Sequence, residues 1–182
     1  KATGDWILSL DADERVSLFL RDEIMKALTT KSSLYDGFYL KRADFMWGKE
    51  LLYGETRNLK FLRLAKKGEG VWIGRVHETW DVKGNITDLK NRLLHYPHPM
   101  LEEFLEEIQV YTDLRADELY KKGVKVFWLT IVAYPIGKFF LNYILKRGFL
   151  DGIPGLLFAI IMSFHSFLVR GKLWLLWQKD KQ

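Results

Sequence analysis

Apolar residues in the first hundred positions come in short runs separated by polar or glycine breaks. Runs of this length are typical of β-strands, and one stretch instead has apolar residues at helical spacing. Ser17 can cap that helix, and Phe19, Leu20, Ile24 and Leu28 form its expected apolar stripe. The helix is expected over residues 17–30, and the strands over residues 6–10, 37–40, 59–64, 71–76 and 89–96.

One expected strand alternates well enough to predict its two faces. Within residues 59–64, Leu62 and Leu64 should share one face, and Arg63 should lie on the other. Gly68 and Gly70 mark the turn that follows it.

The pattern changes after Pro97 and Pro99. Residues 100–122 have the spacing of one amphipathic helix, and two apolar segments follow at residues 126–145 and 152–169. The residues expected on the apolar side of the first helix are Leu101, Phe104, Leu105, Ile108, Tyr111 and Leu114. We therefore predict an α/β portion over residues 1–99 and a helical portion over residues 100–182.

Composition narrows the class of protein. The 182 residues include 48% hydrophobic residues, 15% aromatic residues and no cysteine, which excludes a disordered chain, disulfides and thiolate chemistry. The net charge of +5 is uneven, because residues 1–120 carry 18 basic and 21 acidic side chains and residues 121–182 carry 10 and 2. A basic region that is also strongly apolar favours anionic lipid over nucleic acid as its partner.

The first candidate site is the acidic triplet that follows residues 6–10. Asp11 and Asp13 are expected at the carboxyl end of a buried parallel strand, on the same side, where open α/β sheets place their ligands. Two carboxylates suit a hard divalent cation that also binds substrate phosphates. Solvated acidic pairs are common too, so the triplet alone leaves both interpretations open.

Two other motifs share this acidic pattern. An EF-hand loop needs an oxygen ligand and a glycine where this chain has Arg15 and Val16, which excludes it. Phosphatases of the haloacid dehalogenase type have threonine or valine in the place of Arg15, which weakens that alternative without removing it.

A second candidate site follows the expected strand at residues 71–76. His77 could bind a metal or a phosphate oxygen, and Glu78 could act as a general base on a hydroxyl group. A surface strand end would carry the same two residues, so this pair also leaves both interpretations open.

Taken together, these stretches resemble family 2 glycosyltransferases, in the branch that includes lipopolysaccharide core glucosyltransferases. The resemblance covers nearly the whole chain and depends on the order and spacing of its elements. They are ATGDWILSLDADERV at residues 2–16, GFYLKR at 37–42, GK at 48–49, FLR at 61–63, KG at 67–68, Trp72 before VHE at 76–78, LHY at 94–96 and GFLDG at 148–152.

The resemblance implies a partial GT-A fold with a mixed sheet, and sugar transfer from a nucleotide donor with inversion. By position, Asp11 and Asp13 would hold Mg²⁺ or Mn²⁺ and the donor, with Asp13 the preferred direct ligand. Glu78 would be the base and His77 would support the metal. Arg42 and Arg63 are candidate donor or acceptor contacts, although either could be a surface arginine.

The family's opening βα units, which hold the nucleotide base, do not match any part of these residues. We therefore expect the 182 residues alone to bind a nucleotide-sugar weakly and to turn over poorly or not at all. The sugar, the nucleotide and the acceptor hydroxyl cannot be deduced from the sequence.

The two apolar segments favour a membrane-interfacial helical region at the cytoplasmic face. A spanning hairpin would put basic residues on both sides of the bilayer, against the usual one-sided bias. Trp128, Tyr134, Tyr143 and Trp174 would lie near the headgroups, and His165 is expected to be packed. A soluble helical subdomain and a transmembrane hairpin remain alternatives.

The sequence thus predicts an inverting, metal-dependent glycosyltransferase that acts on a lipid-linked or cell-envelope saccharide. A non-catalytic membrane-binding module with the same fold and a phosphohydrolase are the alternatives.

Overall fold

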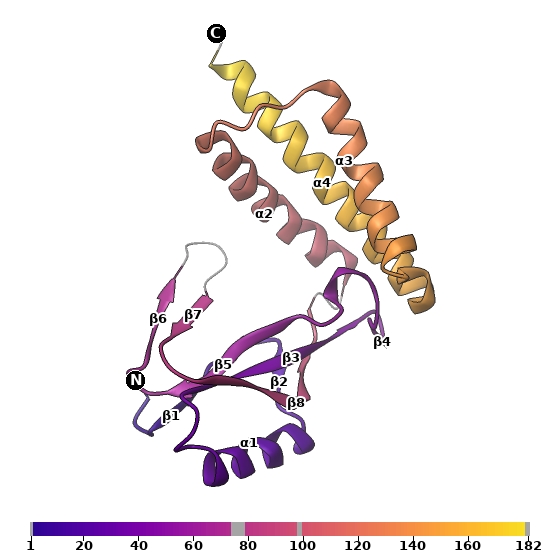
Figure 1. The fold of residues 1–182 in the computed structure, drawn as a ribbon. Coiled ribbons are helices and arrows are strands. Elements are labelled where there is room, and N and C mark those ends of the chain that lie inside the picture. The colour runs from indigo at the N-terminus through magenta and orange to yellow at the C-terminus, as the bar shows by residue number, and fades with distance from the viewer. Residues whose placement is uncertain (1, 74–78, 98–99, 181–182) are drawn as a thin grey trace. The chain divides into compact units, whose positions relative to one another are not determined.

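The computed structural model describes residues 2–73, 79–97 and 100–180. These residues form two compact units (Figure 1). The first unit holds the chain up to Phe45 together with Asn58–Tyr96, and the second holds Met46–Arg57 with the chain from Pro97 onward. Residues 46–57 therefore pack with the C-terminal helices, although the sequence grouped them with the α/β portion.

The first unit is built on a mixed sheet, as predicted. Strand β3 (Gly37–Met46) runs parallel to β8 (Ile86–His95), and the other neighbours in the order β1-β5-β3-β8-β2 are antiparallel. The remaining strands on this path are β1 (Trp6–Leu8), β2 (Glu14–Arg15) and β5 (Lys60–Lys66). The prediction that residues 6–10 form a buried parallel strand is wrong, because β1 ends at Leu8, pairs antiparallel with β5 and is only partly buried.

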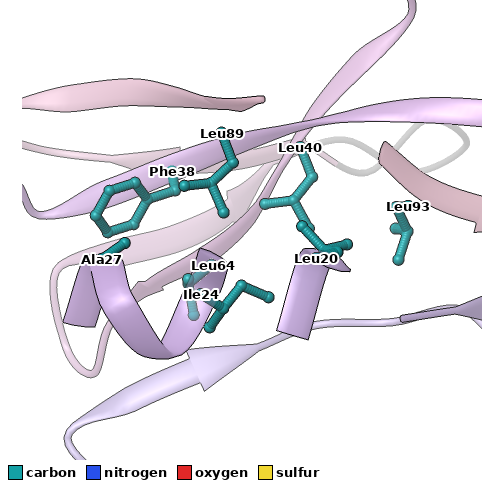
Figure 2. Packing of buried hydrophobic residues seen from close by; sticks show 8 residues of the cluster. All are labelled: Leu20, Ile24, Ala27, Phe38, Leu40, Leu64, Leu89 and Leu93. Atoms are coloured by element: carbon teal, nitrogen blue, oxygen red, sulfur yellow. The ribbon is translucent and has the colours of Figure 1, made fainter. Parts of the chain in front are cut away.

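Helix α1 (Leu18–Thr30) covers one face of this sheet (Figure 2). Ser17 Oγ accepts the backbone N–H of Leu20 at 3.2 Å, so the predicted cap is confirmed. The predicted stripe is wrong at Phe19, which is 78% exposed, because the buried residues at helical spacing are Leu20, Ile24 and Ala27. They pack against five sheet residues: Phe38, Leu40, Leu64, Leu89 and Leu93.

The predicted alternation of β5 fails at Arg63. Phe38 pairs with Leu64 and Tyr39 pairs with Leu62, so Arg63 is an extra residue opposite this step of β3, as in a β-bulge. Leu62 and Leu64 consequently belong to different hydrophobic clusters. The irregularity matters because it re-aims the Arg63 side chain.

The cluster on the other side of the bulge involves a small hairpin. Strands β6 (Gly70–Ile73) and β7 (Thr79–Val82) pair antiparallel, and Trp72 stacks on Trp80 with ring centroids 5.4 Å apart. Trp80 and Val82 pack against Leu62 and Ala65 of β5. Strand β2 was not predicted because its two residues are too few to give a period-2 signal, and β7 was missed although its four residues alternate between exposed and buried positions.

The second unit is helical. It contains α2 (Leu101–Lys121), α3 (Trp128–Phe140) with a π-helical turn at Leu141–Leu145, a 3-10 turn at Gly148–Asp151 and α4 (Ile153–Lys179). Both α2 and α3 pack on α4. The stripe predicted for α2 is correct at Phe104 and Ile108, and the buried line continues through Thr112, Ala116 and Leu119. It is wrong at four residues that are exposed: Leu101, Leu105, Tyr111 and Leu114.

Residues 46–57 are held on these helices by apolar contacts and by one buried carboxylate. They include β4 (Lys49–Glu50) and a 3-10 turn at Gly54–Thr56, and Met46 and Leu51 share a cluster with α2 and α4. Asp151 is 2% exposed and accepts the backbone N–H groups of Leu52 and Tyr53 at 3.2 and 2.9 Å. Lys49 Nζ donates to the Asp151 carbonyl at 2.8 Å, so two of the stretches that carry the family resemblance, GK and GFLDG, meet here.

Much of the helical surface is apolar. No residue of α3 is buried, and Trp128, Leu129, Val132, Ile136 and Phe140 are all more than half exposed. Two stretches, Trp128–Leu145 and Ile153–Lys179, are long and apolar enough to cross a membrane, which is weak evidence for either a spanning or an interfacial position.

Candidate functional site

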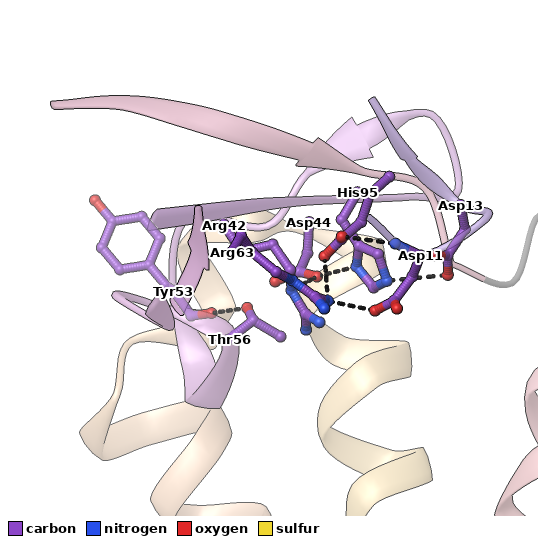
Figure 3. Close-up of polar contacts among 9 residues, drawn as sticks. Asp11, Asp13, Arg42, Asp44, Tyr53, Thr56, Arg63 and His95 are labelled. Atoms are coloured by element: carbon purple, nitrogen blue, oxygen red, sulfur yellow. Dashed lines mark hydrogen bonds and ion pairs between the residues drawn. The ribbon is translucent and has the colours of Figure 1, made fainter. Parts of the chain in front are cut away.

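Three polar residues lie in one row across the sheet of the first unit. His95 at the end of β8 is in register with Glu14 of β2 on one side and with Asp44 of β3 on the other. Residues in register project to the same face, so the three side chains gather at one end of the sheet. All three are at most 9% exposed. We call this row of Glu14, His95 and Asp44 the buried base of the site, and Figure 3 shows His95 and Asp44 beside the two aspartates of the acidic triplet.

Arg63 connects this base to Asp11. Its Nη2 atom is 2.8 Å from Glu14 Oε1 and also pairs with Asp11 Oδ2. Glu14 Oε2 in turn accepts the Asp11 backbone N–H at 3.0 Å, and the Glu14 N–H donates to the Asp11 carbonyl at 3.0 Å. The bulge in β5 thus places a guanidinium under the turn that carries Asp11, and Glu14 fixes that turn through its backbone.

His95 connects the base to Asp13. Its Nε2 atom lies 3.1 Å from Asp13 Oδ2, and its Nδ1 atom lies 2.5 Å from Asp44 Oδ1. Both ring nitrogens therefore face carboxylates. Arg42 Nε lies 2.9 Å from the same Asp44 oxygen, so Asp44 is held between the Arg42 guanidinium and the His95 ring.

The result is two exposed carboxylates on a buried support. The Asp11 and Asp13 side chains are 59% and 41% exposed, whereas those of Glu14, Asp44 and Arg63 are at most 10% exposed. Four carboxylates meet two guanidinium groups and one imidazole, so the cluster has an excess of negative charge. That excess favours a cation at the exposed carboxylates.

The donor set also fits a particular kind of metal site. Among the described residues, no group of three or more acidic, histidine or cysteine side chains is arranged to hold a metal ion by itself. Asp11 and Asp13 therefore suit Mg²⁺ or Mn²⁺ only if a substrate supplies further oxygen ligands, which is how Mg²⁺ usually binds beside phosphates.

The structure brings Asp11 and Asp13 into one cluster, but in a turn between β1 and β2 and not at the carboxyl end of a buried parallel strand as predicted. Arg42 and Arg63 also join this cluster, where each has a carboxylate partner; their contact with a donor stays a prediction. His77 and Glu78 lie outside the described residues, so their predicted roles are untested.

Sequence reasoning missed Glu14, Asp44 and His95 as members of the site. His95 lies in LHY and Glu14 directly follows the acidic triplet, but neither was assigned a role. The sequence did contain one signal that could have found them, because each is a charged or titratable residue near the end of a predicted or possible strand. Their meeting depends on strand register, which the sequence alone does not give.

Comparison with known proteins supplies an independent line of evidence. The chain is 27% identical over 174 residues to the lipopolysaccharide core biosynthesis glycosyltransferase LpsC of Rhizobium meliloti, covering 93% of this chain and 63% of that protein. It is 26% and 28% identical over 181 residues to uncharacterized glycosyltransferases of Rickettsia prowazekii and Rickettsia bellii, covering 93% of this chain and 62% of each relative. No protein-family model matches the chain.

Each of these similarities covers 93% of the chain, so it includes most of the sheet and of the helices. The chain spans a little over three-fifths of the length of the curated relatives it matches, so the activity of a whole protein is not shown by them. The resemblance seen in the sequence is confirmed at the level of the broad family: over nearly all its length, this chain is a homologue of proteins named glycosyltransferases.

Proposed function

We propose that this chain forms the catalytic portion of an inverting, metal-dependent family 2 glycosyltransferase. The observation that carries the proposal is the pair of exposed carboxylates, Asp11 and Asp13, supported from below by Arg63 and His95. The names of the relatives support sugar transfer, and the name of one supports an acceptor in lipopolysaccharide core biosynthesis.

In this proposal Asp13, with Asp11, holds Mg²⁺ or Mn²⁺ and the diphosphate of the nucleotide-sugar. The metal would supply positive charge to the departing diphosphate. Arg63 contacts one oxygen of Asp11 and His95 contacts one oxygen of Asp13, so the turn is held in place while both carboxylates stay exposed to solvent. Preorganisation of this kind lowers the cost of binding a charged ligand.

The base in this proposal is Glu78. It takes the proton of the acceptor hydroxyl while the hydroxyl oxygen bonds to the anomeric carbon and the bond from that carbon to the diphosphate breaks. One in-line displacement inverts the configuration, and no covalent enzyme intermediate is needed. The proton ends on Glu78 and the electron pair of the broken bond ends on the diphosphate.

The helical unit would hold the enzyme against the cytoplasmic face of a membrane. The exposed apolar surface of α3 supports this position, and so does the excess of basic residues after residue 120. A lipid-linked or cell-envelope saccharide would be within reach of an enzyme placed there.

The proposal can be tested in the full-length protein by measuring sugar transfer and nucleotide release together. Asp13→Asn should abolish metal-dependent donor binding, because it removes the carboxylate charge. Glu78→Gln should keep donor binding but lower kcat by about 10²-fold to 10⁴-fold, as expected for loss of a general base.

Asp22→Asn is the matched control, since Asp22 is an exposed carboxylate on α1 whose partner is its neighbour Arg21. It should leave transfer unchanged. Normal transfer by the Asp13→Asn variant would refute the assignment of Asp13 to the metal and the donor. A normal kcat for Glu78→Gln would refute the assignment of Glu78 as the general base.

A further inference from the structure

Two adjoining cavities lie within the helical unit, over the face of α4 between α2 and α3. One has a volume of about 230 Å³ and is lined by residues of all three helices, among them Arg115, Lys138, His165 and Arg170. The other has a volume of about 410 Å³ and lies between α3 and α4 against Ala133, Gly137 and Leu141. Tyr134, Lys138 and Ser166 line both cavities, so the two adjoin each other, and both are open to solvent.

The smaller cavity is basic. Arg115 pairs with Glu118 and Lys138 pairs with Glu55, but Arg170 has only the ring face of Tyr134, 4.0 Å away, among the residues that the structure describes. Burial lowers the pKa of His165, and the charge of Lys138 lowers it further. One arginine without a carboxylate, beside a histidine that resists protonation, indicates a positive potential that an anion would relieve.

The larger cavity is apolar. The side chains of Ala133 and Leu141 and the open backbone at Gly137 form much of its wall, and an added Cβ at Gly137 would meet no atom within 4 Å. Among the described residues that line it, Lys138 alone is charged, and it lies at the border with the basic cavity. An acyl chain would bury apolar surface there without displacing a polar partner.

We propose that these cavities form one site for an anionic lipid, with the phosphate of its headgroup at Arg115, Lys138 and Arg170 and an acyl chain between α3 and α4. This makes specific the membrane contact proposed above. A general apolar surface would bind any bilayer, whereas this site discriminates by phosphate and saturates at one lipid per protein.

The first experiment tests the phosphate. The full-length protein is floated with phosphatidylcholine vesicles, with and without a minor fraction of phosphatidic acid. Arg170→Gln should lower the preference for phosphatidic acid about tenfold, the effect of losing one charge-assisted hydrogen bond. Lys125→Gln is the matched control, because Lys125 also lies over an aromatic ring, that of Trp177, and does not line either cavity.

The second experiment tests the acyl chain. Soluble phosphatidic acids with short chains are used as competitors, and each added methylene should improve competition by about fourfold while the larger cavity, here called the groove, has room. Gly137→Leu should fill the groove and so remove this dependence on chain length. The added side chain should not strain the helix, because a Cβ at Gly137 meets no atom within 4 Å. Gly171→Leu is its control, since Gly171 also lies in a helix with no atom within 4 Å of an added Cβ and does not line the groove.

The outcomes separate this proposal from the broader membrane position. Equal losses for Arg170→Gln and Lys125→Gln would show unspecific attraction of basic residues and would overturn the site, although the membrane position would stand. If glycerol 3-phosphate competed as strongly as the short-chain lipids, the acyl chain would contribute nothing to binding. The ligand would then be a soluble phosphate ester, and the proposal of a lipid site would fail. If the Gly137→Leu variant still showed the same dependence on chain length, the acyl chain would not bind in the larger cavity between α3 and α4.

Discussion

Replacing Arg63 by methionine tests whether the acidic turn rests on a buried ion pair. Arg63 is 9% exposed, and the Glu14 side chain that it contacts is fully buried. Methionine matches the arginine side chain as far as Nε and so keeps the apolar stem packed, but it removes the guanidinium group whose charge balances Glu14. The substitution therefore isolates the electrostatic part of the contact.

The expected cost follows from burial. Removing one partner of a buried ion pair leaves an uncompensated charge and typically costs about 3–5 kcal/mol. The contact of Arg63 with Asp11 adds little to this figure, because the Asp11 side chain is 59% exposed and solvated pairs contribute about 0–1 kcal/mol. Asp11→Asn should thus be nearly neutral for stability, while Arg63→Met should not.

A second substitution separates charge from packing. Glu14→Gln keeps an oxygen that can accept the Asp11 N–H and removes the buried negative charge. The double variant Arg63→Met with Glu14→Gln should therefore be about 1–3 kcal/mol more stable than Arg63→Met alone.

Hydrogen exchange read by mass spectrometry is the suitable assay, because the chain has two units and global unfolding need not be two-state. Peptides that cover β3 and β5 report the opening of the first unit. A loss below about 1 kcal/mol in Arg63→Met, or no recovery in the double variant, would refute the idea that Glu14 and Arg63 depend on each other.

Two further predictions concern other carboxylates that accept backbone hydrogen bonds. Asp151→Ala should destabilise the second unit by about 2–5 kcal/mol, because it leaves the N–H groups of Leu52 and Tyr53 without an acceptor; Asp151→Asn keeps one acceptor and should cost less in the same exchange assay. Glu23 accepts from the N–H groups of Lys90 and Asn91, and although burial raises its pKa, these hydrogen bonds lower it overall. Its contribution to stability should be complete at neutral pH, decline as the pH falls below the ordinary glutamate value of about 4.3 and vanish below its folded pKa, so an acid titration of Glu23→Gln should lack this component.

The parts of the fold that the sequence predicted correctly are those fixed by local signals. Ser17 set the start of α1, the apolar run after Gly37 gave β3, and the spacing after Pro97 gave α2. The sequence predicted less accurately which residues of each helix are buried. Ala27, not Phe19, packs on the sheet, because the angle at which a helix meets a sheet is a tertiary property.

In the candidate site, too, local features were predictable from the sequence and tertiary features were not. The acidic triplet could be found from its neighbours in sequence, but its support could not. The bulge that turns Arg63 toward Asp11 breaks the period that a strand pattern relies on. His95 and Asp44 lie 51 positions apart and meet only through the parallel register of β3 and β8.

The most direct test of the metal and donor assignment is a titration of Mn²⁺ into the full-length protein, followed by electron paramagnetic resonance in the presence of a nucleoside diphosphate. The account predicts bound Mn²⁺ in the unaltered protein and in Asp22→Asn, and its loss in Asp13→Asn even though that variant remains folded. Bound Mn²⁺ of undiminished amount and affinity in Asp13→Asn would contradict it.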